Sequence, residues 1–105
     1  MTQFTIPIMV SLAEWEIVIQ ILRNIVPHRT VWAFGSRARF TAKPYSDLDL
    51  VILGDKALSL KEMADLSEAF SESDLTYKVD VVDWFSASEA FKEIMSADHV
   101  VIQAA

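Results

Sequence analysis

The chain has 105 residues, of which 52% are hydrophobic, and its 15 acidic against nine basic residues give a formal net charge of −6. This length and hydropathy predict one compact domain spanning residues 1–105 and exclude a disordered protein. The negative charge disfavours nucleic acid as a partner, because binding a phosphate backbone requires clustered Lys and Arg.

The absence of cysteine and the shortness of the apolar runs indicate the compartment in which the protein works. The absence of cysteine excludes disulfides and thiolate metal sites and is compatible with a reducing cytoplasm. No Lys or Arg precedes Arg23, and the apolar runs are much shorter than the roughly 20 residues of a membrane span. We therefore expect a cytoplasmic protein without a membrane segment.

The first ten residues carry apolar side chains at alternate positions, namely Phe4, Ile6, Ile8 and Val10. This is the periodicity of a strand, but Pro7 is equally compatible with an edge or irregular segment. Both alternatives stay open.

A helix is predicted next. Ser11-Leu12-Ala13-Glu14 has the spacing of a capping box, and apolar residues then recur at helical intervals up to Pro27. Ile17 and Ile21 lie beside the main apolar stripe of this helix. They indicate either packing on two sides within the domain or a surface for a partner.

Two predicted strands flank a loop. The run Val31 to Phe34 predicts a strand that ends at Gly35, residues 35–46 predict a loop, and Leu48 to Leu53 predicts a second strand. Asp47 and Asp49 are two residues apart, so on extended chain both side chains point to one side, with Cα atoms roughly 6.5 Å apart. That spacing allows both carboxylates to bind one hard cation.

The remaining elements complete an α+β pattern. Ser59-Leu60-Lys61-Glu62 predicts the start of a second helix, and the β-branched and aromatic run Lys78 to Phe85 predicts a third strand beside the second. A third capping box, Ser86-Ala87-Ser88-Glu89, predicts a last helix, followed by an extended tail over His99 to Ile102. The order predicts an α/β sandwich with helices packed on a small mixed sheet.

Three carboxylates in the predicted strands, Asp47, Asp49 and Asp80, require an explanation. A charged side chain in an apolar strand is costly to bury unless it is paired or bound to metal. Mg²⁺ prefers oxygen ligands and takes one or two carboxylates together with substrate phosphates. The pattern therefore predicts a Mg²⁺ site for a nucleoside triphosphate. Asp80 is preferred to Asp83 because residues three apart lie on opposite faces of a strand.

The turn after the first strand has groups that suit phosphate. Gly35 allows the backbone to approach a phosphate closely, and the Ser36 hydroxyl can donate a hydrogen bond to its oxygens. Arg37, Arg39 or Lys43 can neutralise the remaining charge, and Arg37 is the preferred candidate for nucleotide binding.

His28 and His99 have no second ligand at metal spacing, so we expect both at the surface or at a helix end. Trp15, Trp32 and Trp84 are expected to be core aromatics.

These residues also form a known motif. Gly35-Ser36, ten residues and then Asp47-Leu48-Asp49 reproduce the pattern G-S-x₁₀-D-x-D. With Asp80 in the third strand, the chain resembles the minimal nucleotidyltransferases of the polymerase-β superfamily. The resemblance implies a polymerase-β-like core in which the first two Asp residues hold metal ions, the third completes the site and Gly-Ser contacts the triphosphate. Many relatives have glycine where this chain has Phe40.

Small members of this group are typically the antitoxin of a HEPN/MNT toxin–antitoxin pair, and some transfer AMP from ATP to a tyrosine of the toxin. The resemblance therefore implies a Mg²⁺-dependent transfer of a nucleotide, AMP by expectation, to a hydroxyl of a small helical protein partner. Phe40 and Tyr45 are candidates for contact with that partner.

Two alternatives are set against this function. One is a non-catalytic antitoxin that masks its toxin. The other, an enzyme that modifies RNA or an antibiotic, is disfavoured by the negative charge and by the missing second domain. The acceptor, the nucleotide and homo-oligomer formation stay open.

Overall fold

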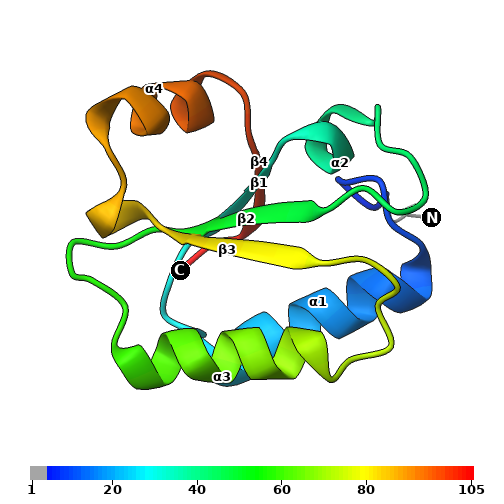
Figure 1. Cartoon of the computed structure of the whole chain (residues 1–105), viewed down its shortest axis with the longest axis horizontal. Helices are drawn as coiled ribbons and strands as arrows, with labels where there is room; N and C mark the ends of the chain where they lie inside the picture. The colour runs from blue at the N-terminus through cyan, green and yellow to red at the C-terminus, as the bar shows by residue number, and fades with distance from the viewer. Residues whose placement is uncertain (1–4) are drawn as a thin grey trace.

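The computed structural model describes residues 5–105, which form a four-stranded mixed sheet with helices on both faces (Figure 1). β1 (Val31–Phe34) pairs antiparallel with β2 (Leu48–Ile52) and with β4 (Val100–Gln103), whereas β2 pairs parallel with β3 (Val79–Asp83). The strand order is β3-β2-β1-β4. The predicted α+β sandwich on a small mixed sheet is confirmed.

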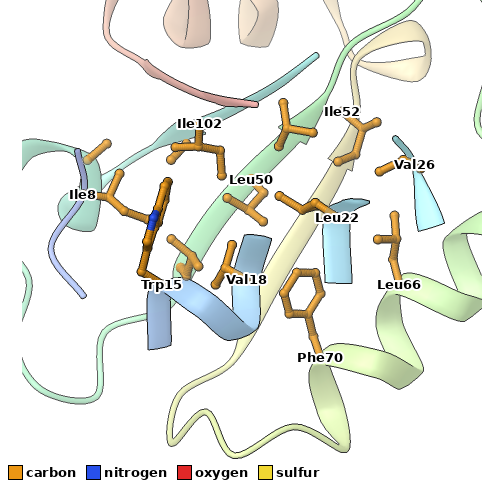
Figure 2. Close-up of a cluster of buried hydrophobic side chains, with 14 of the residues drawn as sticks. Ile8, Trp15, Val18, Leu22, Val26, Leu50, Ile52, Leu66, Phe70 and Ile102 are labelled. Atoms are coloured by element: carbon orange, nitrogen blue, oxygen red, sulfur yellow. The ribbon is translucent and has the colours of Figure 1, made fainter. Parts of the chain in front are cut away.

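The hydrophobic core lies between the sheet and two helices, α1 (Leu12–Ile25) and α3 (Leu60–Ser71), which cover the same face (Figures 1 and 2). The fully buried side chains of this core include Val18, Leu22, Leu48, Leu50, Ile52 and Leu66. Because side chains alternate along β2, Asp49 lies on the opposite face of the sheet.

Both long helices begin as predicted. Ser11 Oγ accepts a hydrogen bond from the Glu14 N–H at 3.1 Å, and Glu14 accepts one from the Ser11 N–H at 2.8 Å. Ser59 and Glu62 form the same capping box at the start of α3. Each box satisfies N–H groups that a helix leaves unpaired in its first turn. Of the two residues beside the main stripe of α1, Ile21 packs against the core, whereas Ile17 is half-buried outside this cluster, so only Ile21 supports packing on two sides.

The region between β1 and β2 corrects one prediction. It is not loop throughout, because residues Ser36–Arg39 form one helical turn, α2. The second predicted strand ends one residue early, at Ile52.

The third strand is also shorter than predicted. It ends at Asp83, whose carboxylate accepts a hydrogen bond from the Phe85 N–H at 3.2 Å and so caps the 3₁₀ turn η1 (Trp84–Ser86). This side-chain bond draws the backbone out of the extended conformation.

The third capping box was predicted at the wrong serine. Helix α4 (Glu89–Ala97) is capped by Ser88, whose Oγ accepts the Phe91 N–H at 3.1 Å. Ser86 Oγ instead donates to Asp83 at 3.2 Å. The extended tail after α4 is confirmed and is a full edge strand, β4, beside β1.

The N-terminal segment resolves the open alternative for the residues that are described. Residues 5–10 form no strand, and Phe4 lies outside the described residues. Ile8 is buried in the core, and the Met9 N–H donates to the Arg37 carbonyl at 2.8 Å. This segment therefore packs against α2 as irregular chain.

The second face of the sheet carries an aromatic cluster beside α4. Trp15 lies in the core as predicted, but Trp32 and Trp84 are half-buried on this other face, in an edge-on contact. The ring of His99 stacks on Trp32 at 3.7 Å, and its Nδ1 lies 3.0 Å from the Met95 carbonyl at the end of α4. His99 is thus a helix-end residue, as predicted. No helix within residues 5–105 is both long and apolar enough to cross a membrane.

Candidate active site

The predicted site begins at Gly35, directly after β1. Its φ of 77° and ψ of −159° lie in a region that only glycine adopts without strain. A Cβ atom at this position would collide with the carboxylate of Asp49. Glycine is therefore needed both for the turn and for the space that the Asp49 side chain occupies.

Asp49 and Asp80 lie side by side at the edge of the site. They are register partners on the parallel strands β2 and β3, which are about 4.8 Å apart in such a pair. Burial raises the pKa of Asp49, and the negative charges of Asp80 and then Asp47 raise it further. The structure thus brings the three predicted carboxylates close enough for their charges to interact.

The oxygen donors of the site have the chemistry that a magnesium ion requires. Within residues 5–105, no three carboxylate or imidazole side chains are arranged so that they hold a metal ion as they stand. Mg²⁺ requires only one or two carboxylates in addition to substrate phosphates and water. Asp47, Asp49 and Asp80 offer only oxygen atoms, the ligand type that Mg²⁺ prefers, so these residues fit the ion.

Lys78 is a site residue that the sequence analysis missed. Its Nζ lies 3.1 Å from Oδ1 of Asp80, and this hydrogen bond, with the charges of Asp80 and Asp47, raises the pKa of Lys78. The ammonium group therefore supplies positive charge beside the carboxylates. The signal was present in the sequence, because Lys78 and Asp80 are two residues apart in the predicted strand Lys78 to Phe85.

Asp83 has a different environment. Its carboxylate accepts hydrogen bonds from the Leu58 N–H at 3.0 Å, from the Phe85 N–H at 3.2 Å and from the Ser86 hydroxyl at 3.2 Å. These bonds tie the end of β3 to the start of α3. Asp80, and not Asp83, is therefore the β3 carboxylate beside Asp49.

Two of the three basic residues between β1 and β2 form contacts within the protein. Arg37 is buried, and its guanidinium donates to backbone carbonyls of the loop and of the N-terminal segment. Arg39 pairs with Asp98 at 2.6 Å, whereas Lys43 is exposed. Nucleotide binding by Arg37 stays a prediction, and these contacts do not favour it. Ser36 directly follows Gly35 as the first residue of α2.

Phe40 ends α2 in a left-handed conformation, with φ of 60° and ψ of 36°. A side chain at such an angle costs about 1–2 kcal/mol, which explains why glycine suits this position. The Phe40 side chain is nevertheless 56% exposed, and Tyr45 in the same loop is 80% exposed. Two large aromatic side chains of the segment between β1 and β2 are therefore exposed to solvent.

Comparison with known proteins agrees with this geometry. The family model described as polymerase beta, nucleotidyltransferase, matches residues 16–104. Over 90 residues the chain is 52% identical to the probable protein adenylyltransferase MntA of Haemophilus influenzae, which covers 86% of this chain and 79% of that protein.

Two solved structures are similar in fold. One is a chain of a toxin–antitoxin complex with AMP-PNP, with a TM-score of 0.73 and 25% identity over 87% of this chain and 73% of the other. The second is from a mutant MntA–HpeT toxin–antitoxin complex, with a TM-score of 0.72 and 26% identity over 90% and 75% of the two chains. With the Gly35 turn and the paired carboxylates of β2 and β3, these matches show that the chain belongs to the polymerase-β nucleotidyltransferase family.

Proposed function

We propose that residues 1–105 form a single nucleotidyltransferase domain that transfers AMP from ATP to a hydroxyl of a protein acceptor, as the antitoxin of a toxin–antitoxin pair. The observation that carries this proposal is the contact of Gly35 with Asp49 beside Asp80. The 52% identity to a probable protein adenylyltransferase supports the type of reaction. The two similar toxin–antitoxin structures, one of them with AMP-PNP, support the partner and the nucleotide.

Asp47 and Asp49 are the proposed ligands for Mg²⁺, with Asp80 completing the site. Their charges repel one another without a cation, as the raised pKa of Asp49 indicates. When bound, Mg²⁺ would offset the charge of the triphosphate and stabilise the in-line transition state. The turn at Gly35-Ser36 is the proposed contact for the phosphates.

Asp80 is the proposed base for the acceptor hydroxyl. As the hydroxyl oxygen forms its bond to the α-phosphorus, its proton passes to Asp80, and the bond from the α-phosphorus to the bridging oxygen breaks to release pyrophosphate. Lys78 must first leave Asp80. The Lys78 side chain is 72% exposed, and an exposed ion pair of this kind contributes little stability. Breaking the pair to free Asp80 therefore costs little free energy.

A protein acceptor is favoured by an apolar surface that includes the end of α2. Met9, Phe40 and Pro44 contribute to a groove of about 510 Å³ along α2 and the N-terminal segment. Together with the exposed Tyr45, this surface suits contact with a folded partner.

The test uses two labels on ATP. The purified protein is incubated with Mg²⁺, its candidate partner and ATP that is labelled at either the α- or the γ-phosphate. Transfer of AMP predicts label on the partner from α-labelled ATP only. Label from γ-labelled ATP would indicate phosphoryl transfer and would contradict the proposal.

The masking antitoxin is the second candidate, because the exposed Phe40 and Tyr45 suit tight binding whether or not transfer occurs. An Asp49→Asn variant separates the two functions. Masking predicts that the variant still neutralises the partner. Catalysis predicts that the variant binds the partner but neither modifies it nor restores cell growth.

A further inference from the structure

Arg37 is the one charged residue that is buried among residues 5–105, with 5% of its surface exposed. Its Nε donates to the Ser46 carbonyl at 2.9 Å, its Nη1 to the Met9 carbonyl at 2.9 Å and its Nη2 to the Pro44 carbonyl at 3.0 Å. Its Cζ also lies 3.6 Å from the ring centroid of Tyr77. One side chain thus joins α2 to three other segments.

Three of the four segments that Arg37 joins are next in sequence to a part of the candidate site. α2 follows Gly35 directly, Ser46 precedes Asp47, and Tyr77 precedes Lys78 on the way to Asp80. The Leu48 N–H donates to the Lys78 carbonyl at 2.9 Å, so the last two segments also touch each other. Arg37 therefore contacts the segments that lead into Asp47 and into Lys78 and Asp80.

The contacts require the shape of a guanidinium group. Three nitrogens donate in three directions within one plane, and the flat face packs on the Tyr77 ring. Lysine has a single nitrogen and no flat face, so it cannot reproduce this set of contacts. Burial raises the pKa of Tyr77 to about 12, so the ring that packs against the guanidinium is a neutral phenol.

We propose that Arg37 is a positioning residue, which holds Asp47 in place relative to Asp49 and Asp80 and thereby sets the affinity of the site for its divalent cation. This inference rests on the proposed function. It differs from nucleotide binding by Arg37, because the guanidinium acts through the backbone of residues 44–46 and touches no phosphate.

Arg29 is a matched control for Arg37, because it also fixes a loop by hydrogen bonds to backbone carbonyls. Arg29 donates to the Lys56 carbonyl at 2.8 Å and to the Ala57 carbonyl at 3.3 Å. This loop follows β2, at the end of the sheet opposite to Asp49, as the pairing of Val31 with Ile52 indicates. Arg29→Lys therefore repeats the chemistry of Arg37→Lys away from the site.

The experiment measures how two properties depend on Mg²⁺, the rate of AMP transfer and the rise in Tm with AMP-PNP. For Arg37→Lys we expect the Mg²⁺ concentration that gives half of the maximal rate, and the one that gives half of the maximal rise in Tm, to increase about tenfold or more. The rate should recover at high Mg²⁺. For Arg29→Lys we expect the wild-type Mg²⁺ dependence even if its Tm falls. A purely structural role for Arg37 would lower the Tm without changing the Mg²⁺ dependence.

Ser46→Ala is a second variant that leaves the buried side chain intact. Ser46 Oγ accepts the Lys43 N–H at 2.9 Å, so its loss loosens the same loop, and we expect a smaller shift in the same direction. A wild-type Mg²⁺ dependence in both Arg37→Lys and Ser46→Ala would overturn the inference. So would a rise in KM for ATP alone in Arg37→Lys, which would make Arg37 a nucleotide ligand. If the wild-type protein transfers no AMP, the proposed function fails, and the Tm measurement with Mg²⁺ and AMP-PNP still tests Arg37.

Discussion

The carboxyl group of Asp49 is half-buried between Gly35 and Asp80, and its pKa is raised by burial and by two neighbouring carboxylates. A carboxyl group whose pKa is higher in the folded than in the unfolded state stabilises the fold while it is protonated. That contribution is lost as the pH rises through the folded-state pKa. At neutral pH the ionised Asp49 therefore destabilises the metal-free protein.

Asp49→Asn should consequently raise the Tm of the metal-free protein by a few degrees at pH 7 to 8 while abolishing AMP transfer. The gain should shrink as the pH falls below the folded-state pKa of Asp49, because both proteins are then neutral at this position. Thermal melts of both proteins, from pH 8 down to below the folded-state pKa of Asp49, check the effect. A lower Tm at pH 8 would show that the Asp49 charge is compensated in the fold.

Asp80 and Asp83 have separate tasks although they share a strand. Asp80→Asn should reduce the transfer rate by orders of magnitude, because the proposed base and metal ligand is lost. Asp83→Asn should leave the rate per folded molecule within a few fold but lower stability by about 1–2 kcal/mol, because three hydrogen bonds to Asp83 are weakened.

Transfer rates and urea melts of the two variants, measured side by side, check both expectations. The reversed ranking, with a slow Asp83→Asn and an active Asp80→Asn, would contradict the assignment of the β3 carboxylate.

At the scale of elements, α2 has both a functional position and a strained end. Phe40 adopts a left-handed conformation that glycine adopts freely, while its ring is exposed. Strain that is retained at an exposed aromatic residue, at the end of the helical turn that follows Gly35, points to a use for that residue.

Comparing Phe40→Gly with Phe40→Ala isolates this strain, because both variants lose the ring and only alanine retains the unfavourable angle. The glycine variant should be more stable than the alanine variant by about 1 kcal/mol, as measured by urea unfolding. Equal stability would mean that the turn relaxes to another conformation when the ring is removed.

Some elements are predictable from the sequence and others are not. The difference is whether the contacts that form an element join residues that are close or distant in the sequence. The starts of α1 and α3 are predictable because Ser11 with Glu14, and Ser59 with Glu62, form local capping boxes. At the start of α4 the same pattern failed, because Ser86 is bonded to Asp83 and leaves the capping position to Ser88.

Long-range contacts account for the rest. α2 is a single helical turn, and Arg37 within it makes bonds to Met9 and Ser46 that no local pattern reveals. The grouping of Gly35, Asp49 and Asp80 was expected from the motif and the family resemblance, and the structure places Asp49 beside both Gly35 and Asp80. The motif did not reveal that Lys78 pairs with Asp80 or that Arg37 is buried.

At the scale of the whole molecule, exposed large apolar side chains occur on several elements, and Phe40 at the end of α2 is the one that we expect at the contact with the partner. Phe40→Ala should weaken the complex with the partner by about 1 kcal/mol or more and leave ATP binding unchanged, if the ring is buried at the contact. Leu60→Ala is the matched control. Leu60 is 91% exposed at the start of α3, beyond the other end of the sheet, and its loss should not change the affinity. Equal losses for both variants would contradict a contact at α2.

The intact mass of the partner protein, purified after co-expression with this chain, tests the central claim most directly. With the wild-type chain and with Asp83→Asn, we expect the partner to gain the mass of one or more adenylyl groups, and tandem mass spectrometry should place them on a hydroxyl side chain. With Asp49→Asn the partner should co-purify at its unmodified mass. An unmodified partner in the presence of the wild-type chain, with neutralisation of the partner intact, would contradict catalysis and leave masking as the function.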